Sequence, residues 1–375
     1  MRRRVLIPAG AVTAGLVLAG AIAFAGGANA GVTAAAKPGP GLTKAQITKV
    51  LTFVDNYWVK NGTDEAANNW KNATFHHGNL AFVTMSGVSN HVTLPWATAN
   101  NFKLPTDKRG PFFPDTFAPG EVYLDLQAFH PADSHLADLR SRIKAQVADV
   151  NAGNVSTWNY VDALNMAMPE YARIGVLDKS SSDLSTMQTL FNYTEKTAGG
   201  KGLYSETDSL WWRDSKYVNT TTFWSRGNGW AFMALAKVLN VLPATDPRVK
   251  EYKRVFVAMA TKLKSLQRSD GFWNVDLGNA ADFPGDETTG TAMFTYGMSW
   301  GINHGVLKSA DYKSVVEKAW VGMVNKAVQT SGLLGFCQGT GQRPSDDQPV
   351  TSKKTSAVGV GAFLLAGSEL AVLEG

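Results

Sequence analysis

The 375-residue sequence contains a single cysteine, Cys337, and this scarcity excludes several classes of protein. One thiol can form neither an internal disulfide nor a cysteine-based metal site. The sequence also lacks the HExxH zinc motif, the P-loop and the dinucleotide fingerprint, so metal-dependent and cofactor-dependent chemistry is disfavoured. We therefore predict no metal and no cofactor. Stability must come from a large apolar core, which a chain of this length can form.

Net charge is also low once the N-terminus is set aside. The sequence has 36 basic and 31 acidic residues, and three of the basic ones are Arg2, Arg3 and Arg4. Removing these three leaves 33 basic against 31 acidic residues, a net charge of +2. Nucleic-acid-binding proteins carry a basic patch or stripe. The balance found here predicts no nucleic-acid partner.

The first thirty residues have the features of a secretory signal peptide. The three arginines precede an apolar stretch, and Ala28-Asn29-Ala30 forms a small-residue cleavage site. We predict a signal peptide over 1–30, a flexible linker over 31–42 and a single domain over 43–375. The expected product is secreted, extracellular or associated with the cell wall, without stable membrane insertion after cleavage. A single membrane anchor is the alternative, and the export route, general or twin-arginine, stays open.

Two kinds of helical pattern alternate along the chain. Amphipathic patterns, typical of helices that face water on one side, occupy 44–58, 134–150, 182–196, 246–268 and 309–329. Patterns that contain glycine and are apolar or aromatic on nearly every face occupy 230–242, 290–302 and 357–372. Helices of this second kind must be surrounded by protein.

An internal repeat of roughly 65 residues relates these helices. Each repeat pairs an outer helix with an inner one, and the inner candidates lie near 70–85, 116–129, 159–175, 226–242, 289–304 and 356–374. Five outer helices are clear, and a sixth near 88–103 is weak. We predict an all-α fold in which six hairpins close into an (α/α)6 barrel. An open solenoid would show the same local pattern, but the count of six favours closure.

Two carboxyl groups occupy unusual surroundings. Asp162 lies among apolar neighbours in TWNYVDALNMAMPEYARIG, residues 157–175. A carboxylate there costs free energy unless it is paired or protonated, and desolvation raises its pKa towards what a general acid needs. The alternative is an aspartate that caps a neighbouring helix or pairs with an arginine. Asp115 lies shortly before another inner helix, and a second acid nearby would raise one pKa of the pair further.

The segment FWSRGNGWAFMALAKVL, residues 223–239, begins a buried helix with an arginine and two glycines. In a closed barrel the inner helices would direct their N-termini, which favour anions, towards one mouth. We expect Gly227-Asn228-Gly229 to form a turn that allows close backbone approach. Arg226 would then grip a carboxylate through two parallel hydrogen bonds, and Trp230 would lie against a sugar ring. Alternatively, Arg226 pairs with a protein carboxylate and Trp230 fills the core.

Four segments carry a family resemblance: YVDALNMAMP at 160–169, WSRGNGW at 224–230, ETTGTAMF at 287–294 and GVGAFLLAG at 359–367. Together they resemble the unsaturated glucuronyl and rhamnogalacturonyl hydrolases of glycoside hydrolase families 88 and 105. The resemblance runs from about residue 45 to the end of the chain. It implies an (α/α)6 barrel, in agreement with the repeat. It also implies an acidic oligosaccharide substrate that ends in a Δ4,5-unsaturated uronic acid.

The resemblance assigns roles to residues at matching positions. Asp162 would protonate C4 of the alkene and then accept a proton from the water that adds at C5, while Asp115 would assist or position that water. The uronate would be contacted by Arg226, Trp230 and Tyr160, the last standing where many members have tryptophan. Many members also place a histidine shortly after the Gly-Leu-aromatic element. This sequence has Glu206 there, so we expect Glu206, or the segment Trp211-Trp212-Arg213, to contact the substrate instead.

Two other functions fit the same residues. One is an (α/α)6 hydrolase of saturated acidic glycans in which Asp162 and Asp115 act as an acid and base pair. The other is a non-catalytic secreted protein that binds carbohydrate in the aromatic cleft. The sequence does not specify the polysaccharide or the oligomeric state.

Overall fold

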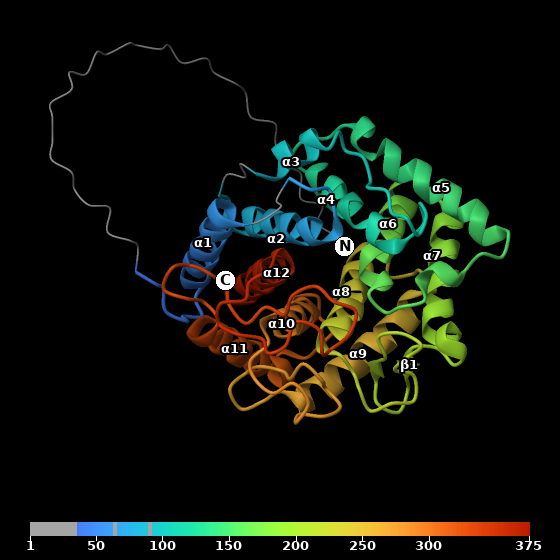
Figure 1. Ribbon diagram of the computed structural model, residues 1–375. Helices are drawn as coiled ribbons and strands as arrows, with labels where there is room; N and C mark the ends of the chain where they lie inside the picture. The colour runs from blue at the N-terminus through green and yellow to red at the C-terminus, as the bar shows by residue number, and fades with distance from the viewer. Residues whose placement is uncertain (1–35, 63–65, 89–91) are drawn as a thin grey trace, which may run out of the picture. The chain divides into compact units, whose positions relative to one another are not determined.

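The predicted inner helices are present in the computed structural model, which describes residues 36–62, 66–88 and 92–375. They are α2 (Trp70–Ser86), α4 (Ala118–Leu126), α6 (Ala163–Leu177), α8 (Ser225–Val241), α10 (Thr288–Asn303) and α12 (Ala357–Leu373). Each packs against the next, and α12 packs against α2, so the inner helices of the unit Ala36–Gly375 close into a ring (Figure 1). The (α/α)6 barrel is confirmed, and the open solenoid is wrong. The predicted signal peptide and the first residues of the linker lie outside the described residues.

An outer helix precedes each inner helix in the chain. The outer set is α1 (Lys44–Asn61), α3 (Thr93–Ala99), α5 (Ala137–Asn151), α7 (Ser181–Lys196), α9 (Val249–Leu266) and α11 (Ser309–Lys326). The weak sixth pattern corresponds to α3, which has only 7 residues. Burial follows the two kinds of pattern. Along α9 only one face is buried, whereas α10 is buried on all sides from Thr288 to Ile302.

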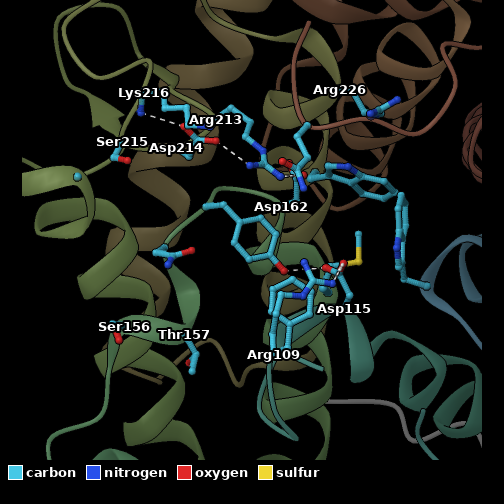
Figure 2. Close-up of a pocket in the computed structure, with 18 of the residues that line it drawn as sticks. Arg109, Asp115, Ser156, Thr157, Asp162, Arg213, Asp214, Ser215, Lys216 and Arg226 are labelled. Atoms are coloured by element: carbon cyan, nitrogen blue, oxygen red, sulfur yellow. Dashed lines mark hydrogen bonds and ion pairs between the residues drawn. The ribbon is translucent and has the colours of Figure 1, made fainter. Parts of the chain in front are cut away.

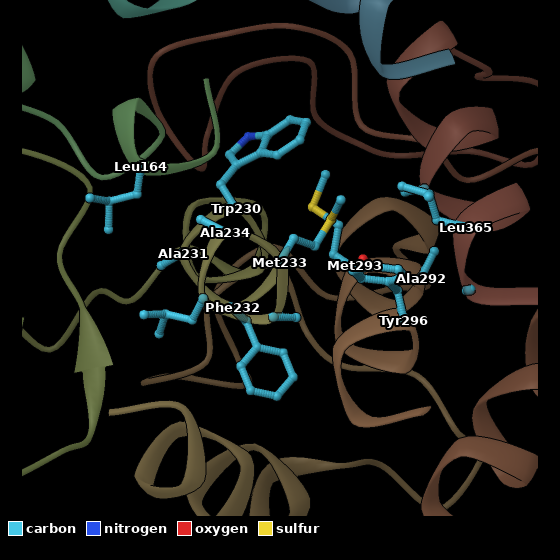
Figure 3. Close-up of a cluster of buried hydrophobic side chains, with 14 of the residues drawn as sticks. Leu164, Trp230, Ala231, Phe232, Met233, Ala234, Ala292, Met293, Tyr296 and Leu365 are labelled. Carbon is cyan, nitrogen blue, oxygen red and sulfur yellow. The ribbon is translucent and has the colours of Figure 1, made fainter. Parts of the chain in front are cut away.

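Glycines let the inner helices approach closely. A Cβ atom at Gly78 of α2 would lie 2.3 Å from the carbonyl oxygen of Gly361 in α12, which no side chain can tolerate. Between α8 and α10, a Cβ at Gly229 would lie 2.6 Å from the sulfur of Met293. Met293, Trp230 and other apolar side chains fill the space between these helices (Figure 3). The glycine content of the inner patterns therefore reflects packing distance.

The prediction of a turn at Gly227-Asn228-Gly229 is wrong. Helix α8 begins at Ser225, so both glycines lie within its first turns. Close approach is nevertheless their function. A Cβ at Gly227 would lie 3.0 Å from the side chain of Val161 and 3.6 Å from Oδ1 of Asp162. Glycine at this position thus makes room beside the candidate acid.

Short elements connect the hairpins. They are the 3-10 helices η1 (Pro114–Thr116), η2 (Asp133–Leu136), η3 (Ser156–Trp158) and η4 (Ala198–Gly200), and the antiparallel strands β1 (Tyr204–Ser205) and β2 (Leu210–Trp211). Within the described ranges, no helix combines the length and apolar character needed to span a bilayer.

Candidate active site

A cavity of about 900 Å³ lies where several inner helices begin. Its wall includes the first residue of α2, the segment before α4, the start of α6, the residues that follow β2, the first turns of α8 and the 340–342 loop. The prediction that inner-helix N-termini share one mouth is therefore confirmed for α2, α6 and α8, with the segment before α4. Six of the eight residues predicted for the site line this cavity: Asp115, Tyr160, Asp162, Arg213, Arg226 and Trp230. Figure 2 labels four of them, Asp115, Asp162, Arg213 and Arg226.

Asp162 immediately precedes α6, so its predicted place inside a helix is wrong. Its side chain makes no capping hydrogen bond to that helix. Only 15% of the side chain is exposed, and Oδ1 is buried without a hydrogen-bond partner. Burial raises the pKa of Asp162, while the charges of Arg213 and Arg226 act in the opposite direction. A buried carboxyl with a raised pKa is suited to hold a proton that it can donate.

Arg213 is brought to Asp162 by backbone pairing. The amide of Val161 donates to the carbonyl of Arg213 at 2.9 Å, and Tyr160 forms an antiparallel bridge with Asp214. As a result, a guanidinium nitrogen of Arg213 lies 3.7 Å from Oδ2 of Asp162. A second one donates to Asp214 at 2.7 Å (Figure 2).

Asn228 fixes the strand that leads to Arg213. Its side-chain oxygen accepts from the Trp211 amide at 2.8 Å, and its side-chain nitrogen donates to the Trp211 carbonyl at 3.0 Å. Both backbone groups of this β2 residue are therefore held by one side chain of α8. The asparagine of the Arg-Gly-Asn-Gly-Trp segment thus positions the strand and, through it, the arginine two residues later.

Asp115 lies in η1 on the other side of Tyr160. The Tyr160 hydroxyl donates to Oδ1 of Asp115 at 2.7 Å, and the Tyr160 ring stacks on Phe113. Burial raises the pKa of Asp115 to about 6; the Tyr160 hydrogen bond opposes this rise and the charge of Asp162 adds to it. The structure therefore places two carboxyl groups with raised pKa values in one cavity, as the sequence predicted.

Arg226 does not pair with a carboxylate through a hydrogen bond. Its guanidinium donates to the carbonyl oxygens of Gln338 at 3.1 Å, Gly339 at 2.6 Å and Gly341 at 3.3 Å. It also lies 4.2 Å from the ring centre of Trp224, and only 3% of Arg226 is exposed. Arg226 thus holds the loop that forms one wall of the cavity.

Two tryptophans meet at the cavity. Trp230 of α8 is 1% exposed, so it offers little surface to a sugar and mainly fills the core. It contacts Trp70 edge to face at 6.2 Å between ring centres. Trp70 is only partly buried and also lines the cavity. Its position as the first residue of an inner helix was a signal that the sequence reasoning missed.

Glu206 and Trp212 are not among the residues that line the cavity. Glu206 is exposed and pairs with Arg254 of the outer helix α9 at 2.8 Å. The indole nitrogen of Trp212 donates to the Thr220 carbonyl at 2.9 Å, and its ring stacks on Phe223. The predicted substrate contact of these two side chains is therefore corrected. Trp211 is fully buried and also absent from the cavity wall. Of the four residues expected to replace the family histidine, only Arg213 reaches the cavity.

Sequence reasoning also missed several polar lining residues. Arg109 lies 3.3 Å above the Phe113 ring and 4.0 Å from Asp115. Towards the η3 side the wall becomes polar and partly exposed, with Ser156, Thr157, Asn159 and Lys216. These residues lie in connecting segments without periodic pattern, so no helical signal distinguishes them.

Other chemistry-bearing groups lie outside the cavity wall. Ser299 occurs in a Gly-x-Ser-x-Gly pattern, but it is fully buried in the middle of α10 instead of on a strand-to-helix turn. His77 bonds to Asp125, and His76 bonds to the Thr93 hydroxyl at 3.0 Å. In the described part of the chain no group of three or more His, Cys, Asp or Glu side chains is placed to hold a metal ion.

Comparisons with known proteins agree with this geometry. The family model of Glycosyl Hydrolase Family 88 matches residues 44–373. An unsaturated 3S-rhamnoglycuronyl hydrolase of Alteromonas sp. is 33% identical over 221 residues, which are 57% of this chain and 51% of that protein. One of Formosa agariphila is 30% identical over 254 residues, 64% of this chain and 65% of that protein. The alignments thus span about half to two thirds of these curated relatives.

A solved structure of a family 88 protein is similar to this chain over the whole barrel. The glycosyl hydrolase family 88 protein from Bacteroides vulgatus superposes with a TM-score of 0.80 at 30% identity, covering 87% of this chain and 98% of its own. The family model spans nearly all of the described barrel, including every helix from α1 to α12. The chain therefore belongs to glycosyl hydrolase family 88.

Proposed function

We propose that this protein hydrolyses oligosaccharides whose non-reducing end is a Δ4,5-unsaturated uronic acid. The observation that carries the proposal is Asp162, a mostly buried carboxyl in the cavity wall with one unpaired oxygen and an arginine 3.7 Å from the other. The reaction requires one group that first gives and then accepts a proton. The names of the two curated relatives, both unsaturated rhamnoglycuronyl hydrolases, support the same class of substrate.

The chemistry needs a single acid. The proton of Asp162 is transferred to C4, and the electrons of the C4=C5 bond form the new C–H bond. This leaves an oxocarbenium-like centre at C5, stabilised by the ring oxygen. Water adds to C5 and gives its proton to the Asp162 carboxylate, which restores the acid. The resulting hemiketal opens, C1 becomes an aldehyde, and the glycosidic oxygen leaves as the alcohol of the next sugar.

Asp115 is suited to a supporting role in this reaction. Its pKa, raised by burial to about 6, leaves it ionised in neutral solution, and an ionised carboxylate accepts hydrogen bonds from water. The Tyr160 hydroxyl fixes one of its oxygens at 2.7 Å. We assign Asp115 to orient the water that adds at C5. Trp70 and the polar residues near η3 would then contact the substrate's sugars.

The test is an absorbance assay with oligosaccharides prepared by lyase digestion of several acidic polysaccharides. We expect enzyme-dependent loss of the absorbance of the conjugated double bond. Asp162→Asn should lower this rate by about 10²- to 10⁴-fold, the contribution of general acid–base catalysis. Asp282→Asn, an exposed aspartate outside the cavity wall, serves as the matched control and should keep wild-type activity.

Three results would contradict the proposal. Full activity of Asp162→Asn would remove Asp162 from the mechanism. Turnover of saturated oligosaccharides, with no change in the double bond of unsaturated ones, would favour the saturated-glycan hydrolase. Saturable oligosaccharide binding without any product would favour a carbohydrate-binding protein.

We also propose that residues 1–30 direct export. The basic start, the apolar stretch and the Ala28-Asn29-Ala30 site support this. Expression of the full chain should yield an extracellular or wall-associated protein whose N-terminal sequence begins at Gly31. An intact N-terminus on a membrane-bound product would instead support the anchor.

A further inference from the structure

Three arginines line the cavity, and two of them, Arg213 and Arg226, act on Asp162 by their charge. The N–H groups of these two are used differently. Arg226 is 3% exposed and donates three hydrogen bonds to backbone carbonyls of residues 338–341. The side chain of Arg213 donates one hydrogen bond, to Asp214, and approaches Asp162 only at ion-pair distance. Its Nε is buried without a partner. Arg213 therefore has N–H groups that can still bond to a ligand, whereas most N–H groups of Arg226 are already bonded to backbone carbonyls.

Substrate chemistry restricts where the carboxylate-binding cation can lie. In a Δ4,5-unsaturated uronate the carboxylate is bonded to C5, and the acid must reach C4, the neighbouring atom. The cation that pairs with the carboxylate must consequently lie close to the acid. Arg213 satisfies this condition, because its guanidinium is 3.7 Å from Oδ2 of Asp162. The charge of Arg226 also acts on Asp162, but its N–H groups donate to carbonyl oxygens of the 338–341 loop.

The loop that Arg226 holds is also fixed by hydrogen bonds of its own. The buried side chain of Gln338 donates to the carbonyls of Pro344 and Asp346 and accepts from the Trp224 indole. Arg226 adds three bonds at the start of this loop, and Thr340, Gly341 and Gln342 face the cavity. Such contacts fix the loop in place without requiring any contact between Arg226 and substrate.

We propose that Arg213 binds the carboxylate of the unsaturated uronate, exchanging its contact with Asp162 for the substrate, and that Arg226 is a positioning residue for the 338–341 loop. This inference rests on the proposed function and departs from the role that the family resemblance gave to Arg226. The exchange has a chemical consequence. The bound carboxylate takes the cation away from Asp162 and places a negative charge beside it, and both effects favour the protonated acid. Substrate binding thus prepares the proton that the reaction needs.

The experiment compares an unsaturated disaccharide with its methyl ester, which has no carboxylate charge. If Arg213 forms a hydrogen-bonded ion pair with the substrate carboxylate, wild-type kcat/KM should be about 10- to 100-fold higher for the acid than for the ester. Arg213→Gln should bring this ratio to within about threefold of one. Arg213→Lys keeps the charge and should keep an intermediate ratio. Arg226→Gln should lower kcat/KM for acid and ester by similar factors and preserve the ratio.

The outcomes separate the two proposals. If wild type turns over neither compound, nor any other unsaturated oligosaccharide, the proposed function fails, and the assignment of Arg213 fails with it. If wild type is active but Arg213→Gln keeps the full ratio, or Arg226→Gln abolishes it, only the assignment of Arg213 is overturned. Circular dichroism establishes that each variant is folded. Should Arg213→Gln not fold, an unchanged wild-type ratio in Arg213→Lys would overturn the assignment.

Discussion

Replacement of Asp115 by asparagine should stabilise the protein in a pH-dependent way. Burial raises the pKa of this carboxyl from 3.8 to about 6 in the folded protein. The folded state therefore binds the proton more tightly than the unfolded chain does, and stability is lost as the pH rises from below 3.8 to above 6. A pKa difference of about 2 corresponds to about 3 kcal/mol. This is the stability that ionised Asp115 removes at pH 7.5.

Asparagine stays neutral at every pH and can still accept the Tyr160 hydrogen bond. At pH 7.5, Asp115→Asn should thus raise the free energy of unfolding by about 1 to 3 kcal/mol. The upper value is the whole free energy that corresponds to the pKa difference between the folded and unfolded states. Below pH 3.8 the aspartate is also neutral, so the two proteins should be equally stable there. The variant should lose activity even as it gains stability, because it lacks the carboxylate that orients water.

Urea denaturation of both proteins at a series of pH values between 3.5 and 7.5 (about half-unit steps) measures this difference. The exposed Asp282→Asn serves as the control and should follow wild type throughout. A difference in unfolding free energy that does not grow as the pH rises through 6 would refute the reasoning. So would a variant that is less stable than wild type at pH 7.5.

Three further predictions follow from contacts of the site and the barrel. Tyr160→Phe removes a hydrogen bond that lowers the pKa of Asp115. The midpoint on the acid side of the kcat/KM–pH profile should therefore rise by about 1 pH unit, and an unchanged midpoint would contradict this. Gly229→Ala places a Cβ 2.6 Å from the Met293 sulfur and should lower the free energy of unfolding by about 1 to 3 kcal/mol. Adding Met293→Ala to this variant should partly restore stability, whereas additive losses from the two substitutions would exclude the steric explanation. Asn228→Ala leaves both backbone groups of one β2 residue without their partner and should cost about 2 to 4 kcal/mol, measured by thermal unfolding; an unchanged midpoint temperature would show that water replaces the side chain.

The fold was predictable because its signals are local and repeated. Helices that are apolar all round can only be stable inside the protein, and amphipathic ones must lie outside them. The alternation of the two kinds, with six inner candidates and five clear outer ones, therefore indicated a barrel before any contact was known. The weakest member, α3, has only 7 residues, too few for a strong period. The glycines at 227 and 229 were misinterpreted because close helix packing and a turn use the same residue type.

Prediction of the site was less complete. Asp162 was identified by its apolar neighbours, although it precedes the helix instead of lying within it. Glu206 was selected because of its place after a family element, but the structure directs it to the outer helix α9. Trp70, which lines the cavity, lies outside the segments that carry the family resemblance, and its place at the start of an inner helix was the one signal for it. Whether a side chain faces the cavity depends on the direction in which it points, and sequence spacing does not give this direction outside regular helices.

Composition and periodicity are enough to identify the inner helices, because a helix that is apolar on every face must be buried. The return of the chain through an outer helix between inner ones places the N-termini of several inner helices at one mouth. Tertiary contacts, by contrast, determine which arginine lies beside Asp162 and which one holds the cavity wall. Arg213 reaches Asp162 because two irregular segments pair through their backbones, and Arg226 bonds to a carbonyl 112 residues away. Contacts between distant, non-periodic segments leave no local pattern, so they became visible only when the chain was folded.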